Sequence, residues 1–412
     1  MFLALGLARF GGWRDLAAHA GLLAWWGAWS GTAVLLARSG AGVDGGWVMA
    51  SAGSLAACGL VVTRAAWPER LGAHGLLWVA ASATALLIST LPWERLVQTS
   101  WRAGAWTLAA LLLPLVAGTE VGGTRAWLRW GPWSLQPAEL AKAGAILVLA
   151  GKLPPAPGSL PARAEACPRR LAPEHHPRGL RGIRELVGAG FFWCLVTAGF
   201  VLQRDLGSGA VVFMLLPAGL LLAGWGWLPV TAVLVLGGAA GWVLLSHFPH
   251  ALARVEAWLA LWRLEPAASY QVWQGLASLA LGGLWGQPAG FSEGLVVPAA
   301  ATDLPLAIIA PGAGVVAIWG ILYLQWTIVD RGLGAARASG GSARVLVGLA
   351  AILWGLEALV PTAGWLGLLP LTGLPLPLVS RGGTALIAHG ILLGWLLWGL
   401  RRARGTAGVT DS

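Results

Sequence analysis

The sequence predicts an all-α polytopic membrane protein, and three observations support this prediction. Of the 412 residues, 57% are hydrophobic and 11% are charged, and the mean hydropathy is +0.72. A soluble domain carries about 25% charged residues, so this chain lacks the polar surface that water requires. Apolar stretches of about 18 residues or more recur along the chain, and each can cross a bilayer as a helix. Segments of about ten residues with alternating polarity, typical of a transmembrane barrel, are absent from the sequence.

The apolar stretches predict ten core transmembrane helices and one extra N-terminal helix. The extra span is expected at residues 17–38, within an N-terminal extension of residues 1–45, and the core domain covers residues 46–402. The core spans are predicted at 46–64, 71–91, 103–118, 136–152, 186–203, 208–226, 228–247, 304–328, 345–361 and 383–400. Residues 403–412 form a short tail.

Positive charge orients these spans. The net charge is +10, and nearly all cations are arginines in loops between apolar segments. The positive-inside rule assigns such loops to the cytoplasm, so the charge indicates topology and no nucleic-acid binding is expected. The basic stretches are the loop at 153–185, the loop around 331–344 and the tail, and an even number of spans separates each from the next. We therefore predict a cytoplasmic C-terminus.

The same topology makes residues 248–303 a large extracellular loop before the eighth core span. Its apolar middle, YQVWQGLASLALGGLWGQ from Tyr270 to Gln287, predicts a re-entrant or interfacial helix. A segment this long with apolar faces is expected to fold onto the bundle.

Glu139 and Lys142 stand one helical turn apart near the start of an apolar span, after Gln136 and Pro137. Ionisable side chains at membrane depth are costly and mark either a site or a paired structural clamp. At a spacing of three residues, the two can neutralise each other on one helix face. The residues alone leave open whether the pair is the polar floor of a substrate cavity or a structural ion pair.

Two aspartates are predicted at the outer ends of apolar spans. Asp205, within LQRDLGSG, is placed to cap the next helix by accepting its unpaired amides, and we favour this cap over a polar groove. Asp303 precedes Pro305, which is placed as in a first helical turn. Asp303 is either another cap or a general base at the membrane–water boundary, where partial desolvation would raise its pKa.

Residues 369–387, LPLTGLPLPLVSRGGTALI, are too rich in proline and glycine for a regular helix. Broken backbone at membrane depth is tolerated where it lines a cavity or is buried in protein. Ser380 and Arg381 are candidate donors to an anionic group, although an arginine near the membrane surface is also ordinary. Outward-facing arginines, two aspartates and a broken helix together suit an anionic lipid-linked substrate.

Five ordered motifs resemble the SEDS family (shape, elongation, division and sporulation), whose members include RodA and FtsW. The first motif is matched by Gly123, Trp127, Gly131, Gln136, Pro137, Ala138, Glu139, Leu140 and Lys142. The next three are matched by Gln203, Arg204, Asp205, Leu206 and Gly207, by Tyr270, Gln271, Gly282, Gly283 and Gly286, and by Thr302 and Asp303. The last is matched by Pro370, Thr372, Gly373, Pro375, Pro377, Ser380, Gly382 and Gly383. The resemblance covers residues 46–402.

This resemblance implies a multi-pass peptidoglycan glycosyltransferase of the bacterial cytoplasmic (inner) membrane. Such proteins polymerise lipid II, the undecaprenyl-pyrophosphate disaccharide-pentapeptide, at the outer face for cell elongation or division. They work with a class B penicillin-binding protein. By resemblance Asp303 is the catalytic general base. Arg254, Arg381 or a divalent metal (Mg²⁺ or Mn²⁺) would stabilise the departing pyrophosphate.

The resemblance also assigns roles to the other motif residues. The substrate-binding candidates are Arg254, Tyr270, Gln271, Asp205, Ser380 and Arg381. The structural or cavity-lining candidates are Trp127, Gln136, Glu139 and Lys142. In this setting, Glu139 and Lys142 become a charged clamp below the cavity of Asp303.

The chain departs from the family pattern around Asp303. Ala299 and Ala301 replace an acidic and an imidazole group, and Arg381 replaces a tyrosine. Pro311–Gly314 replaces a Glu-Glu-Leu-Gly sequence, and Pro311 is expected to kink its helix. Two alternatives to a polymerase are therefore a lipid II-binding scaffold or regulator of a penicillin-binding protein, and a flippase of lipid-linked precursors.

Overall fold

The computed structural model describes residues 41–121, 123–131, 133–156, 180–265, 269–287 and 300–407, and most of these residues are helical. Within these residues, eight helices are long and apolar enough to cross a membrane. They cover Gly42–Ala66, Pro68–Thr90, Trp93–Ala117, Arg184–Leu202, Trp227–Leu244, Pro305–Ala338, Gly341–Trp365 and Gly383–Gly405. Pro137–Lys152 and Leu206–Leu222 are shorter apolar helical stretches. The ten predicted core spans therefore all fall on apolar helices, while the extra span at 17–38 lies outside the described residues.

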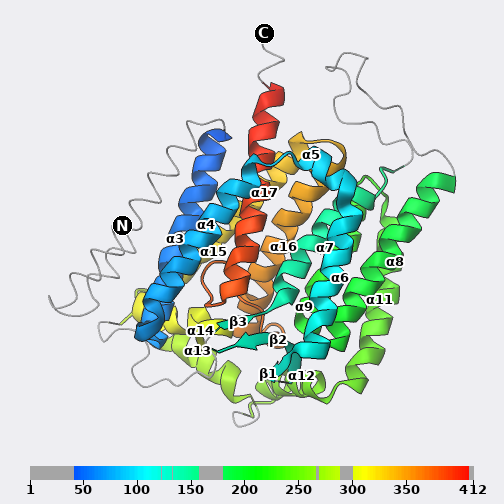
Figure 1. The fold of residues 1–412 in the computed structure, drawn as a ribbon. Helices are drawn as coiled ribbons and strands as arrows, with labels where there is room; N and C mark the ends of the chain where they lie inside the picture. Colours follow the sequence, from blue (N-terminus) through cyan, green and yellow to red (C-terminus); the bar gives the residue numbers. More distant parts are fainter. Residues whose placement is uncertain are drawn as a thin grey trace. The chain divides into compact units, whose positions relative to one another are not determined.

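Figure 1 shows these elements coloured along the chain. The N-terminal half contains α3 (Gly42–Ala66), η3 (Pro68–Arg70), α4 (Leu71–Thr90), α5 (Trp93–Leu96), η4 (Val97–Thr99), α6 (Ser100–Ala117), β1 (Thr119–Val121), β2 (Thr124–Trp130), β3 (Trp133–Leu135), α7 (Pro137–Lys152) and α8 (Leu180–Leu202). The C-terminal half contains α9 (Leu206–Phe213), α10 (Leu215–Leu222), α11 (Trp227–His247), α12 (Pro249–Trp262), α13 (Tyr270–Gly282), α14 (Ala300–Asp303), α15 (Pro305–Ala338), α16 (Gly341–Trp365) and α17 (Gly383–Ala407).

A small antiparallel sheet, in the order β1-β2-β3, adds to the predicted all-α fold. Leu128 pairs with Leu135, and Trp130 pairs with Trp133. Along β2 the buried side chains alternate with more exposed ones, and Ala126 is fully buried. This period of two residues is the pattern of a half-buried strand.

The chain packs as two compact units. The first contains the described residues up to Ser82 together with Pro249–Ile328 and Trp354–His389. The second contains Ala83–Phe248, Val329–Leu353 and the described residues from Gly390 onward.

In the first unit, α15 is broken, as expected for the helix that contains Pro311. The non-helical residue is Gly314, with φ 73° and ψ 179°. The turn after α13 supplies backbone partners at this break. The hydrogen bonds run from the Val315 amide to the Gly283 carbonyl (2.9 Å), from the Val316 amide to the Leu284 carbonyl (3.2 Å), and from the Gln287 amide to the Pro311 carbonyl (2.8 Å). The broken backbone is thus satisfied within the protein, as the bilayer interior requires.

Glycines permit this contact between the turn and the helix. A Cβ atom on Gly282 would overlap the carbonyl of Ala310, and one on Gly286 would overlap the carbonyl of Gly312. A Cβ atom on Gly314 would likewise overlap the backbone of the turn. As expected, the apolar part of residues 248–303 therefore packs against a long apolar helix of the first unit.

The predicted break in the proline-rich segment is also present, at residues 366–382, between α16 and α17. Most of its residues from Leu374 to Ser380 are buried. A Cβ on Gly59 of α3 would lie 2.6 Å from the carbonyl oxygen of Leu378, so α3 packs directly against this backbone. The segment is therefore a buried structural element of the first unit.

Candidate active site

Asp303 and Arg254 meet at the glycine of the broken segment. Asp303 is the last residue of α14, and Arg254 extends from α12. The Arg254 Nη1 donates to the carbonyl oxygen of Thr372 at 2.9 Å. A Cβ built on Gly373 would lie 3.4 Å from Asp303 Oδ2 and 3.8 Å from Arg254 Nη2. Gly373 has φ +72°, so its backbone conformation favours a residue without a side chain.

These residues line a cavity of about 350 Å³ in the first unit. Four predicted site residues, Arg254, Tyr270, Gln271 and Asp303, come together there. The remaining lining residues are Ala253, Ala257, Trp258, Ser269, Val272, Leu371 and Gly373. Cavities of a few hundred Å³ with mostly apolar walls and a few convergent polar groups are typical of ligand sites.

The environment of Asp303 is suited to a base. Its side chain is half-buried, and this burial raises its pKa above the ordinary value. A side-chain hydrogen bond with Thr302 and the positive charge of Arg254 act in the opposite direction and lower the pKa in part. A carboxylate with a raised pKa is a stronger proton acceptor in its ionised form.

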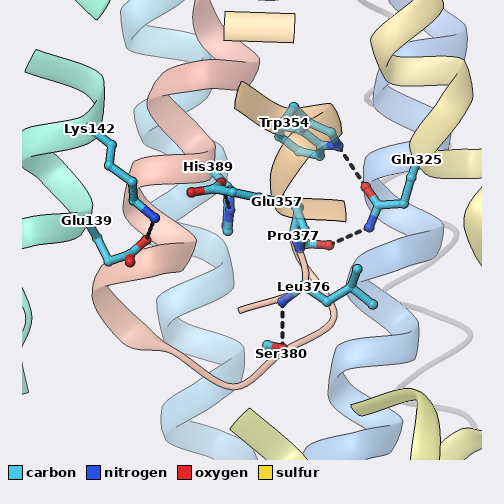
Figure 2. A network of polar contacts seen from close by, with 9 residues as sticks. All are labelled: Glu139, Lys142, Gln325, Trp354, Glu357, Leu376, Pro377, Ser380 and His389. Atoms are coloured by element: carbon cyan, nitrogen blue, oxygen red, sulfur yellow. Dashed lines mark hydrogen bonds and ion pairs between the residues drawn. The ribbon is translucent and has the colours of Figure 1, made fainter. Parts of the chain in front are cut away.

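Buried hydrogen bonds hold the broken segment that carries Gly373. Gln325 of α15 donates through Nε2 to the carbonyl of Pro377 at 2.8 Å. The indole of Trp354 in α16 donates to Gln325 Oε1 at 2.7 Å. The hydroxyl oxygen of Ser380 accepts the amide of Leu376 at 2.8 Å (Figure 2).

Ser380, a predicted donor to substrate, has a structural contact within the broken segment. Ser380 is 3% exposed, its oxygen closes a turn of the segment, and it does not line the cavity. A hydroxyl that accepts an amide hydrogen bond keeps its own hydrogen to donate, so contact of Ser380 with substrate stays a prediction.

Arg381 also lies outside the cavity lining. Its guanidinium stacks over the ring of Trp67, with Cζ 4.6 Å from the ring centroid. Its amide donates to the carbonyl of Ala301 at 2.9 Å, two residues before Asp303. Burial, and then the like charge of Arg70, lower the pKa of Arg381, while Glu69 raises it. Arg381 thus stands in a cationic environment beside the segment that carries Asp303.

The remaining predicted residues belong to the second unit. Lys142 Nζ lies 2.9 Å from Glu139 Oε2, with side-chain exposures of 1% and 2%, so the predicted ion pair is confirmed (Figure 2). Gln136 immediately precedes α7, and Trp127 lies in β2. Asp205 caps α9 by accepting the amide of Ser208 at 3.1 Å, as the favoured interpretation predicted. Contact of these residues with substrate remains a prediction.

Sequence reasoning missed one further buried pair in the first unit. His389 Nε2 lies 3.0 Å from Glu357 Oε2, and both side chains are 2% exposed. The ring of His389 also meets that of Trp354 edge-on, with centroids 5.6 Å apart. A single acidic residue in the apolar run of α16 and a single histidine in that of α17 were the available signals.

The described helices define a multi-pass helical membrane protein with a broken segment and a cavity that brings a carboxylate and a guanidinium together. Residues 67–404 match the family model FTSW_RODA_SPOVE, described as cell cycle protein. The chain belongs to this family, which confirms the resemblance given by the five motifs.

Named relatives and solved structures agree. The chain is 30% identical to the peptidoglycan glycosyltransferase RodA of Mycobacterium tuberculosis (strain H37Rv) over 325 residues, 77% of this chain and 68% of that protein. It is 32% identical to the probable peptidoglycan glycosyltransferase FtsW of Alkalilimnicola ehrlichii over 302 residues, 71% of this chain and 70% of that protein.

Among solved structures, the rod shape determining protein RodA of Thermus thermophilus has a TM-score of 0.60 and 25% identity. That match covers 86% of this chain and 95% of the other. A chain from a peptidoglycan synthase complex that coordinates polymerization and crosslinking has a TM-score of 0.67 and 27% identity, covering 86% of this chain and 97% of the other. These matches confirm the predicted all-helical polytopic fold.

Proposed function

We propose that this chain is a peptidoglycan glycosyltransferase that polymerises lipid II at the outer face of the bacterial cytoplasmic membrane, with Asp303 as its general base. Family membership and the named relatives support the activity class. The observation that supports the base is the cavity in which Asp303 and Arg254 flank Gly373. The predicted topology, with a cytoplasmic C-terminus, places this cavity outside.

The reaction joins two sugars. The 4-hydroxyl of the acceptor sugar attacks the anomeric carbon of the donor, and the bond from that carbon to the pyrophosphate breaks. Asp303 accepts the hydroxyl proton, because an alcohol is a poor nucleophile until a base removes its proton in the transition state. The electron pair of the broken bond leaves with the lipid pyrophosphate.

The departing pyrophosphate needs positive charge near it. Arg254 lies in the cavity and supplies one cation. Arg381 is held on Trp67 next to the segment of Asp303, which supports its assignment as a second cation. Both arginines keep the roles that the resemblance implied, although only Arg254 lines the cavity.

A divalent metal would find few protein ligands here. Asp303 is the one carboxylate in the cavity lining, and no group of three or more His, Cys, Asp or Glu side chains in the described part of the chain could hold an ion. Mg²⁺ can bind through one carboxylate together with substrate phosphates. Mg²⁺ or Mn²⁺ therefore remains a proposal, and no step above depends on it.

The partner we propose is a class B penicillin-binding protein. Polymerised glycan must be crosslinked by a transpeptidase to form a wall. The solved relative from a synthase complex that coordinates polymerization and crosslinking supports this pairing.

The test is polymerisation of labelled lipid II by the purified full chain with its cognate penicillin-binding protein. We expect glycan ladders from the wild type and none from Asp303→Asn, which keeps the shape but removes the base. Asp330→Asn is the matched control, because it makes the same chemical change in α15, at an aspartate that does not line the cavity. Ladders from Asp303→Asn would refute the assigned base. No ladders from the wild type with any partner or metal would refute the enzyme, and protein-dependent lipid movement across liposomes would then favour a flippase.

A further inference from the structure

A second cavity, of about 600 Å³, lies in the second unit among α6, α7 and α8. It is lined by Trp101, Gly104, Ala105, Leu108, Val148, Lys152, Arg184, Glu185, Gly188 and Phe192. None of these residues takes part in the site of Asp303. We call it the α6–α8 cavity.

The apolar part of the α6–α8 cavity has small residues between aromatic ones. Gly104 of α6 packs closely on α8, since a Cβ on Gly104 would lie 3.2 Å from the ring of Phe192. A Cβ on Gly188 of α8 would meet nothing within 4 Å. Trp101 is 62% exposed. This surface suits a flexible hydrocarbon chain, because its lining between the helices is mostly apolar and open beside Gly188.

The polar part of the cavity carries cations. Lys152 ends α7, and Arg184 lies near the start of α8; both side chains are exposed. Glu185 also lines the cavity, so the formal charge of the lining is +1. The helix dipole explains a lysine at the C-terminal end of α7, but it does not favour an arginine near the N-terminal end of α8. The positive-inside rule accounts for cations at this end of the helices, and both cations are placed to contact a negatively charged group in the cavity.

We propose that the α6–α8 cavity binds a phospholipid with an anionic headgroup. Its phosphate lies between Lys152 and Arg184, and one acyl chain lies along Trp101, Leu108 and Phe192. Both cations flank the loop that the positive-inside rule assigns to the cytoplasm. Anionic lipids are enriched in the cytoplasmic leaflet, and basic pockets between helices on that side bind their headgroups. This proposal does not depend on the glycosyltransferase activity.

The test is a lipid-binding measurement on the purified full chain. A fluorescent phosphatidylglycerol is bound in detergent and displaced by unlabelled phosphatidylglycerol, phosphatidylcholine or glycerol 3-phosphate. We expect phosphatidylglycerol to displace it best and glycerol 3-phosphate, which lacks acyl chains, to displace it poorly. One cation near a lipid headgroup is worth about fivefold in affinity. Lys152→Gln and Arg184→Gln should each weaken binding by about that factor.

Two further variants sharpen the result. Glu185→Gln removes the only acid of the lining and should strengthen binding. Arg337→Gln removes an exposed arginine at the end of α15, outside the cavity, and should leave binding unchanged. The proposal would be overturned if phosphatidylcholine displaced the probe as well as phosphatidylglycerol does. It would also be overturned if Arg337→Gln and Arg184→Gln lost the same binding affinity. Failure to retain any phospholipid would overturn it as well.

Discussion

The buried pair of Glu139 and Lys142 offers a sharp test, because breaking it and replacing it have opposite consequences. Lys142→Met leaves a carboxylate in a site where its side chain is 2% exposed, and Glu139→Leu leaves an ammonium that is 1% exposed. Removing one member of such a pair costs about 3–5 kcal/mol, because the other charge stays buried without its counterion. Replacing both members by apolar side chains of similar volume is often neutral or stabilising.

The expected magnitudes follow from the geometry. A separation of 2.9 Å at nearly complete burial places the pair in the strong class, so each single variant should lose about 3–5 kcal/mol of unfolding free energy. At about 1.4 kcal/mol for each factor of ten, this loss lowers the ratio of folded to unfolded protein at least about a hundredfold. The double variant should recover most of it.

The assay is chemical denaturation in mixed micelles for the wild type, both single variants and the double variant. Glu94→Gln is the matched control, since Glu94 pairs with Arg402 but the two side chains are 55% and 38% exposed. An exposed pair is worth about 0–1 kcal/mol. A single variant that loses no more than this control would refute the clamp. If the double variant folds well yet makes no glycan ladders, the pair is needed for activity as well as for folding.

Three other predictions concern the first unit. Gly314→Ala should cost about 3 kcal/mol or more in the same denaturation assay, because only glycine adopts its backbone angles without strain. Gly320→Ala, on the same helix with open space around it, should be neutral or stabilising. Equal losses in the two variants would contradict this explanation. Burial raises the pKa of Asp303, so polymerisation should fall as the pH is lowered through that raised value. Arg254→Gln removes a positive charge that lowers this pKa, so it should move the loss of activity to higher pH. A shift of the pH–rate profile to lower pH would contradict the prediction. Gln325→Leu leaves the indole N–H of Trp354 and the carbonyl of Pro377 without their partner, and it should cost about 1–3 kcal/mol of stability for each group. An unchanged melting temperature would contradict this prediction.

Hydropathy and local chemistry predicted much of this molecule. The apolar helices at the ten predicted core spans follow from hydropathy, because backbone groups in a bilayer must form their hydrogen bonds within the segment, as a helix does. The cap by Asp205 and the break in the helix of Pro311 follow from rules that act within a few residues. These features do not depend on which segments meet in space.

Long-range pairings could not be predicted in this way. Glu357 and His389 are 32 positions apart on different helices, and each reads as an isolated polar residue in an apolar run. Ser380 was expected to bind an anion, but only the fold shows that the amide of Leu376 reaches its oxygen. The sheet was missed because the alternation in Thr124–Trp130 is short and lies between spans.

The contact between the turn after α13 and the break in α15 has a consequence for how this chain tolerates changes of length. Gly282, Gly286 and Gly314 fit backbone to backbone, so one inserted residue inside 282–286 or 310–316 would put a side chain where no room exists. These contacts impose no such requirement on the number of residues that join the two stretches. Insertions and deletions should therefore be accepted between the turn and α14, and rejected within the turn or the break, which a scan of single-residue insertions can map.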